Sequence, residues 1–249
     1  MPDQVIAFTV SGLRQKYLRE ALDSWSQARG IGDWHLLFAL EPCRVNFPIA
    51  EFTQWAHRSF ASAEVVVADT RLGCLRNTRR AMSLAFAAGA EFAVLAEEDL
   101  LVSTDVLEYF GHCRDTYSAQ ENVTVVCGHS LRAETGGPAD VVRSSWFNPL
   151  VWGTWKDRWE GFIDPSWGPF QGNMESWDNN LRVQVSSAGR EAVFPVQSRS
   201  LHIGQASTLT GMPLSEYFYK GALSSSFRQE RPPQDYREVP FAAVPGLVV

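Results

Sequence analysis

The stretch "FAVLAEEDLLVSTDVLEYF", residues 92–110, places three adjacent carboxylates between two apolar segments. Five apolar residues lead directly into Glu97, Glu98 and Asp99, and the chain is apolar again over residues 100–102. Adjacent carboxylates repel one another and are costly to remove from water. The position of three acids at the end of a buried strand therefore needs an explanation, and the pattern of the neighbouring segments provides one.

The segments around this stretch alternate between apolar strands and amphipathic helices. The pattern predicts strands at residues 4–10, 34–40, 63–69, 91–96 and 122–128, with helices at 13–28, 48–61, 79–90 and 106–117 and a late strand within 192–204. Continuously apolar strands alternating with helices predict an α/β fold with a mostly parallel central sheet covered on both faces. Ligands of such sheets bind beyond the carboxyl ends of the strands, where residues 97–99 fall.

The second half of the chain differs in composition. Six tryptophans fall within one Gly-, Pro- and Asn-containing stretch: Trp146, Trp152, Trp155, Trp159, Trp167 and Trp177. Because no linker separates the two halves, we predict one domain over residues 1–230, with halves of about 1–130 and 131–230. Residues 231–249 are Pro-rich and polar, which predicts a tail that forms an arm or is poorly ordered.

The composition excludes several classes of protein. The formal net charge of −6 argues against a general nucleic-acid binder. The start lacks a basic segment followed by a long apolar run, and no run approaches the roughly 20 residues that span a bilayer. The four cysteines form no CxxC pair, which disfavours a zinc site and favours a reducing cytoplasm.

The acidic triplet is a candidate metal site. Carboxylates at a strand end are natural ligands for Mg²⁺ or Mn²⁺, and a cation there could also hold a diphosphate. The alternative is a set of solvated acids in a surface turn. His202, in "SRSLHIG", is a candidate further ligand if it lies near the triplet, although a single histidine near a strand end is more often structural.

Two other segments carry candidate functional residues. "RLGCLRN" places Arg71, Arg76 and Asn77 around a glycine before a helix, where phosphate oxygens can bind; a simple loop and cap is the alternative. Asp178 in "ESWDNNLR" falls in the first turn of a predicted helix. It is either a helix-start residue favoured by the dipole or a general base. The tryptophans around it resemble a sugar-binding wall, although core packing explains most tryptophans.

The order of these segments resembles the eukaryotic N-acetylglucosaminyltransferase I family. "AVLAEEDLLVSTDVLEYF" is similar to that family's strand, acidic triplet, loop and Glu-Tyr-Phe helix end. "LGCLRN", "FNPLVWGTWKDRW", "ESWDNNLR" and "VQSRSLHIGQAS" resemble its other segments in the same order, so the likeness spans roughly residues 5–225 and is strongest over 92–205. It implies a GT-A fold and inverting, Mn²⁺-dependent transfer of N-acetylglucosamine from UDP-GlcNAc to a sugar hydroxyl.

The resemblance also implies roles for individual residues. Asp99 corresponds to the acid that binds the metal, Glu97 and Glu98 to residues against the ribose and sugar of the donor, and Asp178 to the catalytic base. The remaining correspondences are Glu41 with the acid that pairs with uracil, and Ser11 and Arg76 with the diphosphate positions. Independently of the resemblance, Trp152, Trp167 and Trp177 are the predicted sugar-facing wall.

The chain departs from the family in three respects. The triplet is Glu-Glu-Asp where the family usually has Glu-Asp-Asp, and Glu41 precedes Pro42 where the family has Asp. No anchor or stem precedes the domain, which we interpret as indicating a bacterial, cytoplasmic protein. These departures leave the donor base, the donor sugar and a glycan or small-molecule acceptor open.

We therefore predict a metal-dependent, inverting glycosyltransferase that uses a UDP-sugar, with UDP-GlcNAc favoured and Mn²⁺ or Mg²⁺ as the cofactor. Two alternatives remain at this point. One is a module that binds nucleotide sugars or glycans without catalysis. The other is a glycoside hydrolase that uses the same carboxylates.

Overall fold

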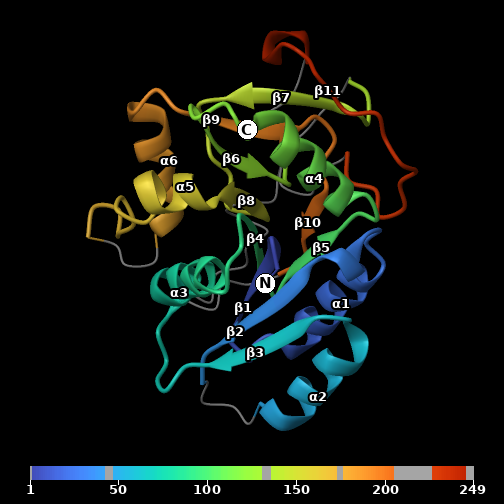
Figure 1. Cartoon of the computed structure of the whole chain (residues 1–249), viewed down its shortest axis with the longest axis vertical. Coiled ribbons are helices and arrows are strands. Elements are labelled where there is room, and N and C mark those ends of the chain that lie inside the picture. The colour runs from blue at the N-terminus through green and yellow to red at the C-terminus, as the bar shows by residue number, and fades with distance from the viewer. Residues whose placement is uncertain (1, 43–46, 131–135, 173–175, 205–225, 245–249) are drawn as a thin grey trace.

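The structure is a computed structural model that describes residues 2–42, 47–130, 136–172, 176–204 and 226–244. Figure 1 shows strands through the centre of the molecule with helices on both sides. Within the described residues no helix is both long enough and apolar enough to cross a bilayer.

The strands form one large sheet and one small sheet. They are β1 (Gln4–Val10), β2 (His35–Leu40), β3 (Ala63–Val67), β4 (Phe92–Glu97), β5 (Leu100–Val102), β6 (Val123–Cys127), β7 (Asp140–Ser144), β8 (Trp152–Trp155), β9 (Glu191–Pro195), β10 (Ser200–His202) and β11 (Arg237–Glu238). The large sheet has the order β11-β7-β9-β6-β8-β4-β1-β2-β3, and β10 pairs with β5 in the small one. Most neighbours in the large sheet are parallel; β8 runs antiparallel to both β4 and β6, and β7 to β9.

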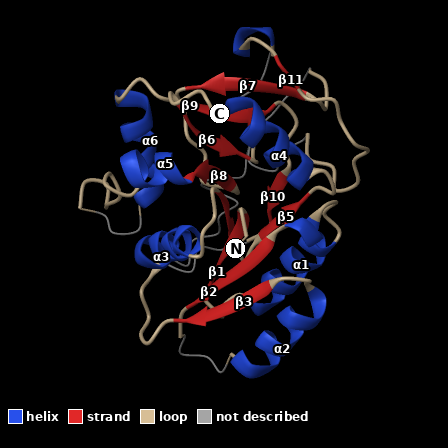
Figure 2. Cartoon of the chain, in the orientation of Figure 1, coloured by secondary structure: helices blue, strands red, loops and turns tan. Residues whose placement is uncertain are grey.

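The helices cover both faces of the large sheet (Figure 2). They are α1 (Gln15–Ser26), α2 (Ile49–Ser59), α3 (Cys74–Ala87), α4 (Val106–Tyr117), α5 (Lys156–Arg158) and α6 (Trp177–Ser187), with short turns η1 (Ile31–Asp33), η2 (Trp159–Ile163) and η3 (Phe241–Ala243). Helices α1, α2 and α4 share one hydrophobic core, whereas α3 and α6 share the other. The predicted α/β class with a mostly parallel, helix-covered sheet is confirmed.

The alternation of side chains along β1 builds both cores. Ile6 and Phe8 face the α1 side, and Val5 and Ala7 face the α3 side, all fully buried. Phe8 contacts Trp25 of α1 edge-on, with ring centroids 5.4 Å apart. Aromatic contacts of this kind add to the free energy gained by burying apolar area, so they fix α1 firmly on the sheet.

Three features of the fold differ from the predicted elements. The late strand at residues 192–204 divides into β9 and β10, which belong to different sheets. β8 lies inside the Trp-rich segment and joins the two parts of the large sheet. In the region that we predicted to be an arm or poorly ordered, β11 pairs with β7 at the sheet edge. Each of these depends on pairing between segments distant in sequence, which local periodicity does not report.

Candidate functional site

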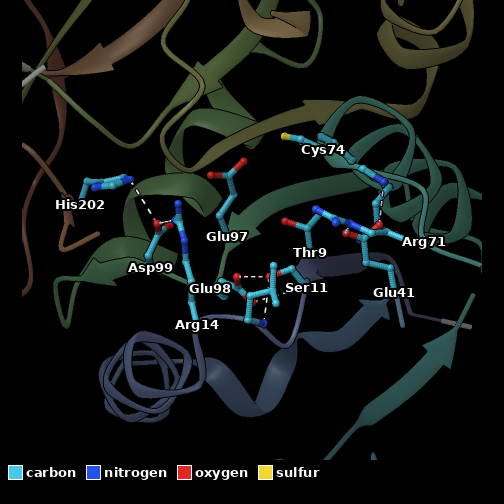
Figure 3. Close-up of a pocket in the computed structure, with 14 residues that line it drawn as sticks. Thr9, Ser11, Arg14, Glu41, Arg71, Cys74, Glu97, Glu98, Asp99 and His202 are labelled. Atoms are coloured by element: carbon cyan, nitrogen blue, oxygen red, sulfur yellow. Dashed lines mark hydrogen bonds and ion pairs between the residues drawn. The ribbon is translucent and has the colours of Figure 1, made fainter. Parts of the chain in front are cut away.

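A cavity of about 230 Å³ opens where β1, β2 and β4 end (Figure 3). Its lining comprises Thr9, Ser11, Leu13, Arg14, Glu41, Arg71, Gly73, Cys74, Asn77, Thr78, Glu97, Glu98, Asp99 and His202. The cavity thus brings together eight of the candidate residues named from the sequence: Ser11, Glu41, Arg71, Asn77, Glu97, Glu98, Asp99 and His202. Parallel strands end at one edge of the sheet, which is why residues from three separate strands meet here.

Asp99 lies at the centre of a charged cluster at one side of the cavity. Its carboxylate is buried and contacts the Arg14 guanidinium, and His202 Nε2 is 3.3 Å from Asp99 Oδ2. His202 reaches this position because β10 pairs with β5, opposite Leu100, directly after the triplet. Burial, with the nearby charge of Arg14 adding to it, lowers the pKa of His202 to about 3, so its imidazole is neutral at pH 7.

The cluster has the chemistry of a partial cation site. Asp99 Oδ1 is buried without a hydrogen-bond partner among the described residues, and His202 supplies a neutral imidazole beside it. A Cβ added at Gly204 would lie 2.5 Å from Asp99 Oδ2, so only glycine leaves this space open. No group of three or more His, Cys, Asp or Glu side chains suited to a metal occurs in the described ranges. Asp99 and His202 would therefore need ligand oxygens or water to complete the coordination of Mn²⁺ or Mg²⁺.

Glu98 lies in the turn directly after β4 and fixes the loop between β1 and α1. The Ser11 backbone N–H donates to Glu98 Oε2 at 3.0 Å, and the Ser11 hydroxyl donates to Oε1 at 2.5 Å. Burial raises the pKa of Glu98, while the Ser11 hydrogen bonds oppose that rise. Both residues were predicted to contact the donor; in this structure they bind each other and hold the loop against the cavity.

Glu97 and Asp178 influence each other electrostatically. Burial raises the pKa of Glu97 to about 7; the nearby Arg14 opposes this rise, and the charge of Asp178 adds to it. Asp178 is in the first turn of α6, and its pKa is also raised, chiefly by burial. The helix start was expected to favour its charged form, and its backbone hydrogen bonds do so, but burial outweighs them. Asp178 is therefore a half-buried carboxyl within electrostatic reach of the acidic strand end.

Glu41 anchors the loop that leads into α3. Its Oε2 accepts hydrogen bonds from the backbone N–H groups of Leu72 and Gly73, both at 2.8 Å. Its Oε1 lies 3.9 Å from Arg71 Nε, on the opposite side of the cavity from Asp99 in Figure 3. One carboxylate oxygen is thus committed to the loop, and the other faces the cavity together with Arg71.

Arg76 is exposed and does not line the cavity. The sequence predicted this helix at residues 79–90, but α3 already begins at Cys74, after Gly73 with a φ of +77°. The helical turn directs Arg76 outward and Asn77 inward, where its side-chain amide donates to the Ala39 carbonyl oxygen at 2.9 Å. The hydrogen bonds from the preceding loop to Glu41 set this early helix start.

The three tryptophans predicted as a sugar-facing wall have different environments. Trp152 is fully buried in β8, and Trp177 is only 4% exposed. Trp167 is half-buried and stacks on Trp177, with ring centroids 4.8 Å apart. The indole N–H of Trp177 donates to Cys74 Sγ at 3.3 Å, and that of Trp167 to the Leu75 carbonyl oxygen at 3.0 Å. These rings pack α6 against α3, and Trp167 alone of the three keeps a partly exposed ring.

Sequence reasoning missed Arg14 as a site residue. Arg14 is the residue before α1, at the end of the loop that Glu98 holds, and its side chain reaches Asp99. The available signal was a basic residue four positions after the end of a predicted strand. That signal is weak because strand ends commonly carry polar residues; its meaning depends on the distant position of Asp99.

Comparison with solved structures identifies the fold as that of the GT-A glycosyltransferases. S. aureus TarS 1–349 in complex with UDP-GlcNAc matches 92% of this chain and 62% of its own, with a TM-score of 0.57 and 9% identity. GalNAc-T7 with UDP, GalNAc and Mn²⁺ matches 87% of this chain and 46% of its own, with a TM-score of 0.57 and 10% identity.

A third structure supports the same fold. The Pyrobaculum calidifontis mannosyltransferase PcManGT, in complex with GDP-Man and Mn²⁺, matches 78% of this chain and 55% of its own, with a TM-score of 0.52 and 14% identity. The chain thus spans between about half and three-fifths of these neighbours. No protein-family model matches it. At these identities the comparison establishes the predicted GT-A fold, and the activity has to be argued from the site.

Proposed function

We propose that this protein is a metal-dependent, inverting glycosyltransferase that transfers a sugar from a UDP-sugar, with UDP-GlcNAc as the favoured donor. The observation that carries the proposal is the buried Asp99 carboxylate with His202 and Gly204 beside it, at the strand-end edge of a GT-A sheet. The Mn²⁺ in two of the structural neighbours and the UDP-GlcNAc in the third support the choice of cofactor and donor.

In this proposal the Asp99 side of the cavity binds the cation and the Glu41 side binds the nucleotide. Asp99 and His202 would hold the cation, which would supply positive charge to offset the negative charge that develops on the departing diphosphate. Arg71, together with the free edge of the Glu41 carboxylate, borders the region for the nucleotide. Glu97, with a pKa of about 7, can both donate and accept hydrogen bonds to sugar hydroxyls at neutral pH.

Asp178 is the proposed general base. Its carboxylate removes the proton from the acceptor hydroxyl, which then attacks the anomeric carbon from the face opposite the nucleotide, so the configuration inverts. A base works best when its pKa lies near the working pH, and burial moves the pKa of Asp178 in that direction. The partly exposed ring of Trp167 offers an apolar face for the acceptor near α6.

A screen of nucleotide sugars with and without Mn²⁺ tests the proposal. We expect UDP-GlcNAc to raise the melting temperature only when Mn²⁺ is present, because a ligand that binds the folded state stabilises it. Release of UDP in the presence of candidate acceptors measures transfer. Cleavage of glycosides without any nucleotide would instead indicate a hydrolase, and binding without UDP release under any condition would indicate a non-catalytic module.

Asp99→Asn is expected to abolish Mn²⁺-dependent UDP binding. The substitution preserves the shape of the side chain but removes the charge and the hard anionic oxygen that the cation needs. Calorimetric titration of UDP in Mn²⁺ measures the effect, and Asp115→Asn, an exposed acid on α4, is the matched control. Equal UDP affinity for Asp99→Asn and the parent would remove Asp99 from the metal site. A cooperative thermal transition without ligand verifies that the variant is folded.

UDP is expected to bind more tightly than CDP in Mn²⁺. The Glu41 Oε1 atom can accept the N3–H of uracil, whereas cytosine has no proton at that nitrogen. Competition of UDP and CDP for the parent and for Glu41→Gln measures this preference. If CDP binds the parent as tightly as UDP does, Glu41 serves the α3 loop alone through its bonds to Leu72 and Gly73.

A further inference from the structure

Arg14 contributes the positive charge that contacts Asp99 in the described structure. Its guanidinium Nη1 is against Asp99 Oδ2, the same oxygen that His202 Nε2 approaches to 3.3 Å. The Arg14 side chain is 16% exposed and that of Asp99 1%, so their contact is largely removed from water. A buried carboxylate is strongly unfavourable without a partner of opposite charge. Arg14 therefore balances the charge of Asp99.

The backbone of Arg14 is held independently of this contact. Glu98 binds Ser11 through both the backbone N–H and the hydroxyl, and Gly12 with a φ of +71° turns the chain toward α1. The three flexible methylenes of an arginine then connect a fixed backbone to a guanidinium at the cavity wall. The guanidinium can leave Asp99 by rotation about side-chain bonds, without movement of α1 or β1.

A divalent cation bound to the Asp99 carboxylate and the Arg14 guanidinium on the same carboxylate would repel each other. Both are cations, and at contact distance in a site of low polarity their repulsion is large. The space around Oδ2 is narrow, because a Cβ added at Gly204 would lie 2.5 Å from Asp99 Oδ2 and 2.6 Å from His202 Cε1. Figure 3 shows His202, Asp99 and Arg14 together at this side of the cavity.

We infer that Arg14 is a built-in counter-ion of Asp99 which a divalent cation must displace, and that the released guanidinium then binds the donor diphosphate. This inference rests on the proposed metal-dependent function. Guanidinium groups bind phosphate oxygens through charge-assisted hydrogen bonds, so a diphosphate in the cavity offers Arg14 a new partner. Metal alone then binds weakly, because Arg14 loses its partner. Metal and nucleotide together bind strongly, because both cations have anions to pair with.

This exchange couples the two ligands. If nucleotide strengthens metal binding by some factor, metal strengthens nucleotide binding by the same factor. Replacing Arg14 should change both the affinity for Mn²⁺ alone and the effect of UDP on that affinity. Mn²⁺ should bind more tightly on its own, because Asp99 is no longer occupied. In this variant UDP should increase the Mn²⁺ affinity by a smaller factor than in the parent, because there is no Arg14 guanidinium to bind the phosphates of UDP.

Calorimetric titration of the full chain with Mn²⁺, in the absence and presence of UDP, tests the inference. Coupling between sites is typically about 5- to 150-fold, and we expect Arg14→Gln to bind Mn²⁺ alone more tightly than the parent by a factor in that range. Arg19→Gln, an exposed arginine on α1, is the matched control for loss of a positive charge and should leave the Mn²⁺ affinity unchanged. Arg14→Lys keeps the charge and should restore an affinity close to that of the parent.

The outcomes separate this inference from the proposed function. The melting temperature in EDTA first verifies that Arg14→Gln is as stable as the parent. If this variant then binds Mn²⁺ no more tightly than the parent does, the exchange is overturned, while metal-dependent transfer stays in place. Tighter binding of Mn²⁺ to Arg14→Gln, together with no transfer from any UDP-sugar by the parent protein, supports the exchange and refutes the transferase. Failure of both proteins to bind Mn²⁺, with or without UDP, overturns both and leaves Arg14 as a permanent ion-pair partner.

Discussion

Asp178→Asn is expected to lower the rate of sugar transfer by about 10²–10⁴-fold, the usual cost of removing a general base. Asparagine retains the size of aspartate and can still accept the local backbone hydrogen bonds at the start of α6, so the fold should persist. The affinity for UDP-sugar in Mn²⁺ should stay near the parental value, because the proposed base faces the acceptor. Rate and donor affinity are therefore measured on the same preparation.

Asp164→Asn is the matched control for this experiment. Asp164 is in the same Trp-rich half and forms an ion pair with Arg79 at 2.6 Å; unlike Asp178, it is not among the charges that raise the pKa of Glu97. The Asp164→Asn variant should transfer sugar at a rate near that of the parent. A parental transfer rate in Asp178→Asn would exclude this residue as the base. A loss of donor binding in Asp178→Asn would instead assign it to the donor site, beside Glu97.

The pH dependence of transfer gives a second test of Asp178. Burial raises its pKa above the usual value of about 3.9 for aspartate. A base acts in its deprotonated form, so the rate should fall as the pH drops through that raised pKa. The acidic limb of the profile for kcat/KM should therefore lie above the ordinary aspartate range, and this limb should be absent from the residual activity of Asp178→Asn.

Arg199→Met is expected to lower the free energy of unfolding by about 3–5 kcal/mol, the usual cost of leaving one member of a buried ion pair unpaired. Arg199 Nε is 2.9 Å from Asp105 Oδ2, and both side chains are fully buried. Tyr236 donates to the same carboxylate at 2.9 Å, and the hydroxyl of Ser103 donates to its other oxygen at 2.7 Å. The network joins the C-terminal segment to the strand β10 that carries His202.

Urea unfolding of the parent and the variant measures this loss. Lys16→Gln is the control, since its pair with Glu20 is exposed at 4.0 Å and such pairs contribute about 0–1 kcal/mol. A change below about 1 kcal/mol for Arg199→Met would show that Asp105 is satisfied by its hydroxyl partners alone. The double variant Asp105→Asn with Arg199→Met removes both charges and should recover part of the loss, because no unpaired ion then remains buried.

The sequence by itself determined the class of the fold and one side of the site. Continuous apolar runs such as residues 92–96 require burial on both faces, and helical periodicity between them requires helices that cover the sheet. Because parallel strands end at one edge, the acids at 97–99, Glu41 after β2 and Ser11 after β1 had to meet there. These conclusions depend only on local patterns and on the geometry common to parallel sheets.

Only the tertiary structure decided what each polar side chain binds. Asp105 directly precedes α4, a position where aspartate often caps a helix, but its carboxylate binds Arg199 and makes no cap hydrogen bond. Trp152 lies in the interior strand β8 and is fully buried, whereas the Trp-rich segment around it suggested a sugar-facing surface. The reason is the same in both cases. A buried charge takes the strongest available partner and a large ring the deepest available space, and both are supplied by segments far away in the sequence.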